Sequence, residues 1–196
     1  MTKDAALIAV IVAVCALASC VQPRVPTPAA GQSISWLLRV GPQRGSQPTV
    51  CASSMPSPCA IMRGVGERLS EPVKLPALPA LLVNPLVPLA TRDVFGRFAG
   101  ARGGSLADDV PTEFDRLIDF MEQHDNDLTP AACACAPVVG EILETLRALP
   151  GVRLARMSGS GPTCFALFSM RDELAKATQT LRDNRPAWWL QPATIG

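Results

Sequence analysis

The chain has no tyrosine, almost no net charge and no long hydrophobic run. A formal net charge of +1 gives no electrostatic reason to expect nucleic acid as a partner. No apolar run reaches the roughly 18 to 20 residues that a membrane-spanning helix needs, which excludes a polytopic membrane protein. Histidine occurs once, at His124, so a zinc site is not predicted.

Carboxylates are almost missing from the first third of the chain. Between Met1 and Gly66 the one acidic residue is Asp4, against five basic residues. Prolines are unevenly placed as well, because twelve of the 19 lie between Pro23 and Pro88. At about 100–200 residues per domain, 196 residues make one domain and a remainder. The composition indicates that the first third is this remainder.

Seven cysteines do not form a regular framework. An odd number without regular spacing is a poor set for disulfides. Cys133 and Cys135 are two residues apart in an alanine-rich helical pattern, so they point to different sides and do not form a CxxC pair. We predict free cysteines, as is usual for a cytoplasmic protein.

Two segments precede the regular part of the chain. Residues 1–20 are predicted to form an apolar helix or a signal-like segment, because Ala5–Ala18 is unbroken apolar sequence and Leu17–Cys20 reads like a lipobox. Residues 21–58 are predicted to be irregular, because proline removes a donor and fixes φ. Residues 59–196 are predicted to form the domain.

Regular hydrophobic periodicity begins near Leu78. Thr91 and Thr112 are predicted to be helix N-caps. Arg102–Asp109 is predicted to be a surface loop. Pro192 indicates that the last strand lies at an edge of the sheet, because proline has no N–H to donate. The predicted elements are, in chain order, a strand at Ala80–Val83, helices at Asp93–Phe98 and Pro111–His124, helices that begin at Thr129 and Pro137, strands at Val152–Met157 and Cys164–Phe168, a helix at Arg171–Arg182 and a strand at Ala187–Ala193.

This order predicts an α+β fold of ferredoxin-like type, a small antiparallel sheet with helices on one face. Two polar segments stand out within it. The turn after Met157 contains Ser158, Gly159, Ser160 and Gly161, and it fits either a hairpin turn or an anion-binding nest of N–H groups.

The second polar segment is Asn126-Asp127, at a helix break. Two short polar residues at such a break usually cap the following helix, here the one that begins near Thr129.

Five segments follow the order and approximate spacing of one family. Over roughly Cys59 to the C-terminus the chain resembles the GHMP kinase superfamily, most specifically in its Met-Ser-Gly-Ser-Gly-Pro-Thr run and the upstream Asn-Asp-Leu. Met62–Glu67 points to the members that act on a cytidine-diphosphate-linked methylerythritol. The segments are Cys59–Glu67, Leu82–Pro85, Thr91–Phe95, Asn126–Leu128 and Ala155–Thr163.

The resemblance implies transfer of the γ-phosphoryl group of ATP, with magnesium, to a hydroxyl of that small-molecule substrate in isoprenoid precursor synthesis. It implies that Thr91 lies near the substrate. It also implies that Ser158, Gly159, Ser160 and Gly161 shape the ATP site. Asn126 and Asp127 would brace that glycine-rich turn.

The first third departs from the family pattern. A GGGSS-type phosphate loop is absent, and Gln47 stands where the family has its catalytic aspartate. Glutamine cannot take a proton at pH 7, so we predict weak or no kinase activity. The missing loop and the odd composition coincide, which suggests a truncated or frame-shifted start. An isolated C-terminal part would expose an apolar face and self-associate through it.

A non-catalytic alternative is a periplasmic binding module. Lipidation of Cys20 would anchor it to the membrane, and the proline-rich segment would be its tether. Membrane association is expected only under this alternative.

Overall fold

The computed structural model describes residues 62–63, 68–69, 71, 75–99 and 110–195. The predicted segments 1–20 and 21–58, with Cys20 and Gln47, lie outside these residues, as does the predicted loop Arg102–Asp109.

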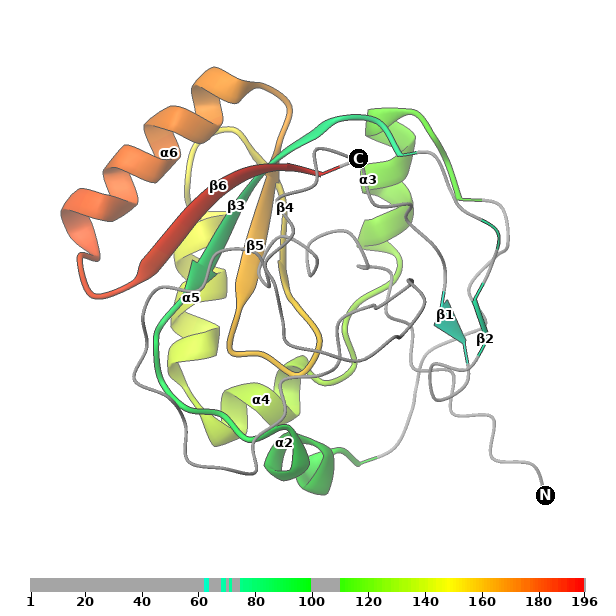
Figure 1. The fold of residues 1–196 in the computed structure, drawn as a ribbon, viewed down its shortest axis with the longest axis vertical. Helices are drawn as coiled ribbons and strands as arrows, with labels where there is room; N and C mark the ends of the chain where they lie inside the picture. The colour runs from blue at the N-terminus through cyan, green and yellow to red at the C-terminus, as the bar shows by residue number, and fades with distance from the viewer. Residues whose placement is uncertain (1–61, 64–67, 70, 72–74, 100–109, 196) are drawn as a thin grey trace, which may run out of the picture.

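A four-stranded antiparallel sheet forms the centre of the fold (Figure 1). Its spatial order is β4-β5-β3-β6, so β5 and β3 are central and β4 and β6 are the edges. A separate two-stranded antiparallel sheet pairs β1 with β2. The strands are β1 Met62–Arg63, β2 Arg68–Leu69, β3 Leu78–Asn84, β4 Val152–Met157, β5 Cys164–Phe168 and β6 Trp189–Ile195.

Five helices lie around the sheet in the described residues. Their apolar residues recur with helical spacing, as at Val139, Ile142, Leu143 and Leu146, all buried. The helices are α2 Thr91–Arg97, α3 Phe114–Glu122, α4 Thr129–Cys135, α5 Val138–Arg147 and α6 Arg171–Asn184.

Both faces of the sheet are buried under helices. In β3, Leu81 and Val83 pack in one apolar cluster with residues of α4, α5 and α6. Ala80 and Leu82, which alternate with them, pack in a second cluster with residues of α3. Side chains of a strand point alternately to opposite faces, so α3 covers the face opposite α5 and α6.

The predicted α+β class and ferredoxin-like order are confirmed. α3 adds a helix on the second face, beyond the helices expected on one face. The predicted edge position of the last strand is also confirmed, since β6 pairs with β3 and ends the sheet, with Pro192 opposite Leu81.

The two predicted threonine caps are wrong. The N-cap positions are Ala90 for α2 and Glu113 for α3, and neither side chain makes a cap hydrogen bond within the described residues. Thr91 is the first residue of its helix, and its hydroxyl is used in a long-range contact instead. Among the helices that the structure describes, none combines the length and apolarity needed to cross a bilayer.

Candidate functional site

The loop Ser158–Thr163 joins β4 to β5 in a tight hairpin. The Ser158 N–H donates to the Thr163 carbonyl at 2.9 Å, and the Gly161 N–H donates to the Ser158 carbonyl at 3.0 Å. Gly159 and Gly161 have φ values of 55° and 77°, which L-residues rarely adopt, and the Gly161–Pro162 peptide bond is cis. We call this segment the glycine loop.

The two glycines are needed for different reasons. A Cβ at Gly161 would lie 2.9 Å from Met157 Sδ and 3.3 Å from Leu89 Cδ2, so this glycine permits close packing. A Cβ at Gly159 would have no described atom within 4 Å, and this residue is exposed. The backbone at Gly159 is therefore open to a ligand, which fits the nest interpretation of the turn.

Asn126 holds the glycine loop from outside. Its Nδ2 donates to the Met157 carbonyl at 3.0 Å and to the Gly159 carbonyl at 2.8 Å. Its Oδ1 accepts from the Leu128 N–H at 3.0 Å, which caps the turn that leads into α4. Asn126 thus braces the loop, as the family resemblance implied. The predicted cap of the next helix is wrong as stated, because the N-cap of α4 is Leu128, without a side-chain cap bond, and Asn126 closes the turn before it.

Two further side chains reach the loop from distant parts of the chain. The hydroxyl oxygens of Thr91 and Ser160 lie 3.0 Å apart in a hydrogen bond. Asn84 Nδ2 donates to Thr163 Oγ1 at 2.8 Å. Three elements, the end of β3, the start of α2 and the segment before α4, therefore converge on one loop.

The structure brings together most of the residues singled out in the sequence. Ser158, Gly159, Ser160 and Gly161 form the glycine loop, and Thr91 and Asn126 contact it. Asp127 follows Asn126 and is half-buried. Contact of these residues with ATP or substrate stays a prediction.

Sequence reasoning did not single out Phe95 or Asn84 as site residues. Phe95 is 40% exposed and lies four residues after Thr91 in α2, so the two share a helix face. An exposed aromatic ring one turn from a polar contact of the loop offers a stacking surface. The signals available in the sequence were the spacing of Thr91 and Phe95 and the place of Asn84 and Phe95 in two segments that carry the family resemblance, Leu82–Pro85 and Thr91–Phe95.

The cysteines in the described part of the chain are free, as predicted: Cys133, Cys135 and Cys164. Burial raises the pKa of the Cys164 thiol to about 12, and the neighbouring Cys133 thiol adds to the rise. A thiol held protonated in this way is a core group and a poor nucleophile.

We expect the stability of the protein to fall at alkaline pH because of Cys164. The folded state holds this thiol proton to about pH 12, whereas an unfolded thiol releases it near 9. The stabilisation is complete below the unfolded pKa and is lost as pH rises towards 12, at up to about 1.4 kcal/mol per pH unit. Urea unfolding at pH 8, 9 and 10 should show a steeper decline for the native chain than for Cys164→Ala. Parallel curves would contradict the assignment.

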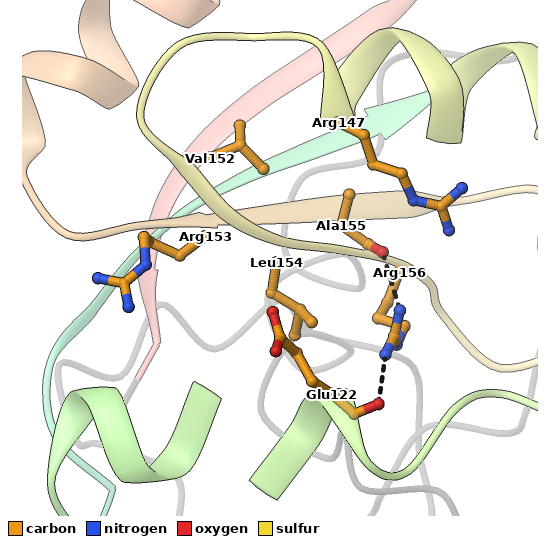
Figure 2. Close-up of a pocket in the computed structure, with 7 residues that line it drawn as sticks. All are labelled: Glu122, Arg147, Val152, Arg153, Leu154, Ala155 and Arg156. Atoms are coloured by element: carbon orange, nitrogen blue, oxygen red, sulfur yellow. Dashed lines mark hydrogen bonds between the residues drawn. The ribbon is translucent and has the colours of Figure 1, made fainter. Parts of the chain in front are cut away.

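A pocket of about 210 Å³ lies beside the edge strand β4, lined by Glu122, Arg147 and residues 152–156 (Figure 2). Two of its arginine charges are already compensated: Arg153 pairs with Asp115 at 2.9 Å and Arg156 pairs with Asp125 at 3.3 Å. We therefore place the candidate site at the glycine loop and not in this pocket.

A metal site is not found in the part of the chain that the structure describes, where no three His, Cys, Asp or Glu side chains are grouped for one ion. The described residues thus offer backbone and hydroxyl groups suited to an anionic ligand, and no ligand set for Mg²⁺.

Comparison with known proteins gives consistent matches. Residues 105–187 match the family model for the GHMP kinases C terminal domain. A 4-diphosphocytidyl-2-C-methyl-D-erythritol kinase of Rhodopseudomonas palustris (strain BisB5) is 43% identical over 77% of this chain and 54% of its own. One of Nitrobacter hamburgensis is 40% identical over 81% of this chain and 54% of its own.

A solved structure is similar as well. The crystal structure of a 4-(cytidine 5'-diphospho)-2C-methyl-D-erythritol kinase superposes with a TM-score of 0.55 and 31% identity, over 70% of this chain and 49% of its own. The chain spans about half the length of the curated relatives that it matches.

Proposed function

Because the C-terminal part of this chain belongs to the GHMP kinase C-terminal domain family, we propose that it forms part of a phosphotransferase site for ATP and 4-diphosphocytidyl-2-C-methyl-D-erythritol. The observation that carries the proposal is the glycine loop, pinned by Asn84, Thr91 and Asn126 with the backbone at Gly159 left open. The kinase names of the relatives support the same activity.

The glycine loop would receive the phosphates of ATP. The exposed Gly159 backbone allows close approach, and the hydrogen bond between Ser160 and Thr91 ties the loop to α2. Bound ATP supplies the γ-phosphoryl group, and Mg²⁺ neutralises part of the phosphate charge. Asn126 keeps the loop in place before the ligand arrives, so its ordering does not reduce affinity.

The start of α2 would bind the acceptor substrate. Thr91 lies beside the loop through its contact with Ser160, which is where an acceptor hydroxyl must meet the phosphate. Phe95, one turn further along the same face, would stack on the cytosine ring. We further propose that this chain alone has weak or no activity, because Gln47 stands where the family pattern has its aspartate.

The lipid-anchored alternative is not favoured, because the curated relatives are kinases. A cytoplasmic location is part of the proposal. Self-association stays a prediction, and the exposed Leu86, Val87 and Phe95 are where we would look for it.

The proposal predicts separate binding of the two substrates to the purified chain. In a ¹⁵N-edited NMR titration, Mg²⁺-ATP should shift the amide signals of Gly159, Ser160 and Gly161. The cytidyl substrate should shift those of Thr91 and Phe95, while Val152 at the other end of β4 stays unchanged. Absence of shifts at both places would overturn the proposed site.

A radiolabelled phosphate-transfer assay on the same sample tests the predicted loss of activity. We expect no product above background. Turnover of the cytidyl substrate would show that this chain is a competent kinase without the family's aspartate at the position of Gln47.

Phe95→Ala is expected to weaken binding of the cytidyl substrate about 5- to 150-fold, since stacking of a base on an aromatic ring contributes about 1–3 kcal/mol. Affinity for ATP should not change. Met170→Ala is the matched control: Met170 is 57% exposed but follows β5 at the end opposite the glycine loop. Equal effects of both substitutions would contradict stacking by Phe95.

A further inference from the structure

Arg156 joins the end of α3 to the edge strand β4. Its Nη2 donates to the Met121 and Glu122 carbonyls, both at 3.4 Å, and its side chain is only 14% exposed. Figure 2 shows the hydrogen bond to the Glu122 carbonyl. The Met121 carbonyl also accepts the His124 N–H at 3.1 Å, so Arg156 is a second donor there, and a cation near a helix C-terminus is favoured by the helix dipole. Arg156 therefore links the end of α3 to the sheet.

The same arginine also contacts Asp125, the residue before Asn126. Arg156 Nε lies 3.3 Å from Asp125 Oδ1. That oxygen accepts the N–H of Asn126 at 2.8 Å. Arg156 Nε and Asp125 form an ion pair without hydrogen-bond geometry, whereas the Asn126 N–H is hydrogen-bonded to the same carboxylate oxygen.

The side chain of Asn126 then reaches the glycine loop. Its Nδ2 binds the Met157 and Gly159 carbonyls, on either side of the first loop residue. β4 is consequently attached to residues 125–126 at two successive positions, once through the side chain of Arg156 and once through the Met157 carbonyl. Two attachment points prevent the segment from rotating about either one.

We propose that Arg156 and Asp125 are positioning residues that hold Asn126, and through it the glycine loop, in the conformation that receives phosphate. The effect on the loop follows from the contacts above, whereas the effect on nucleotide binding rests on the proposed function. Neither residue touches the ligand in this scheme; both act through Asn126.

A matched control lies on the same strand and the same helix. Arg153 Nη2 pairs with Asp115 Oδ1 at 2.9 Å. Asp115 is in the first turn of α3, at the end opposite Asp125, and the Arg153 guanidinium also lies 5.5 Å from the centre of the Phe114 ring. This pair ties β4 to α3 itself, whereas Asp125 follows the end of α3, and it lies far from the loop along both elements.

The test compares Asp125→Ala, Asp125→Asn, Arg156→Gln and the control Arg153→Gln. Amide hydrogen exchange is read at Gly161, whose N–H is bonded within the loop, and at Leu128, whose N–H is bonded to Asn126. Urea unfolding of each variant measures global stability, and ATP affinity is measured by titration calorimetry.

We expect Asp125→Ala and Arg156→Gln to speed exchange at Gly161 and Leu128 roughly tenfold relative to core amides, and to weaken ATP binding by a similar factor. Asp125→Asn keeps an acceptor for the Asn126 N–H and should restore most of the protection. Arg153→Gln should leave exchange in the loop and ATP affinity unchanged.

Three results would overturn the proposal: unchanged loop exchange in Asp125→Ala, a uniform rise at all amides that follows global stability, or an equal effect of Arg153→Gln. If the native chain does not bind ATP, the proposed function fails. The exchange measurements still decide whether Arg156 and Asp125 position the loop.

Discussion

Replacing Phe165 with alanine is expected to lower the free energy of unfolding by about 3–5 kcal/mol. The side chain is fully buried in the central strand β5, opposite Leu82 of β3 on one side and Arg156 of β4 on the other. It belongs to the apolar cluster under α3, so its removal leaves a cavity lined by both the sheet and that helix. Since domains are typically stable by about 5–15 kcal/mol, the variant should lose a large part of its stability.

The measurement is urea unfolding followed by circular dichroism, with Phe95→Ala as the matched control. The substitution is the same, but Phe95 is 40% exposed in α2. We expect its effect to stay within about 0.5 kcal/mol, as for most surface substitutions. Similar losses in the two variants would mean that Phe165 is not the core residue described above.

Asn126→Asp is expected to destabilise the protein by about 2–3 kcal/mol at neutral pH. The substitution keeps the Oδ1 acceptor for the Leu128 N–H but replaces the Nδ2 donor with a carboxylate oxygen. That oxygen would face the Met157 and Gly159 carbonyls at the positions where Nδ2 now lies 3.0 and 2.8 Å from them. The new carboxylate oxygen and the Met157 and Gly159 carbonyls are all acceptors, so they repel one another. Both carbonyls also lose their hydrogen-bond donor.

The loss should shrink at acidic pH. A protonated carboxyl can donate to one of the two carbonyls, so the folded state binds that proton more tightly than the unfolded state does. Unfolding curves at pH 7 and pH 4 should therefore show a smaller difference from the native chain at pH 4.

Asn84→Asp is the matched control, because Asn84 also donates a hydrogen bond to the glycine loop. Asn84 donates to a hydroxyl, Thr163 Oγ1, and a hydroxyl can rotate and become the donor to a carboxylate. The same substitution should therefore cost less than about 1 kcal/mol. If Asn84→Asp and Asn126→Asp were equally costly, the loss would reflect added charge near the loop and not the pairing of acceptors.

The order and type of the elements could be predicted from the sequence because they depend on near neighbours. Apolar residues at helical spacing marked α3 and α5, and the alternation in Val152–Met157 marked β4. The threonine caps could not be settled in this way. Thr91 has a cap-forming side chain, but its hydroxyl bonds Ser160, 69 residues later, which local sequence does not reveal.

The candidate site, too, could be predicted only in part from the sequence. The glycines of the loop were visible in the sequence, because only glycine adopts positive φ without cost. The residues that hold the loop could be recognised in the sequence as polar types, but the atoms that they bind could not. The pairing of Arg156 with Asp125 carried no sequence signal, since two charged residues 31 positions apart are normally separate solvated groups.

The sequence by itself therefore determined the α+β class, the order of the elements and the position of the glycine loop, since periodicity and turn chemistry act over a few residues. Only the tertiary structure decided which face α3 covers and which side chains meet at the loop. Those contacts depend on the antiparallel register in which β4, β5 and β3 pair, which brings Met157, Cys164 and Val83 to one end of the sheet. The β4–β5 register follows from the turn between them, but the pairing of β3 with β5 joins distant segments, such as Val83 and Cys164, and depends on which buried faces pack together.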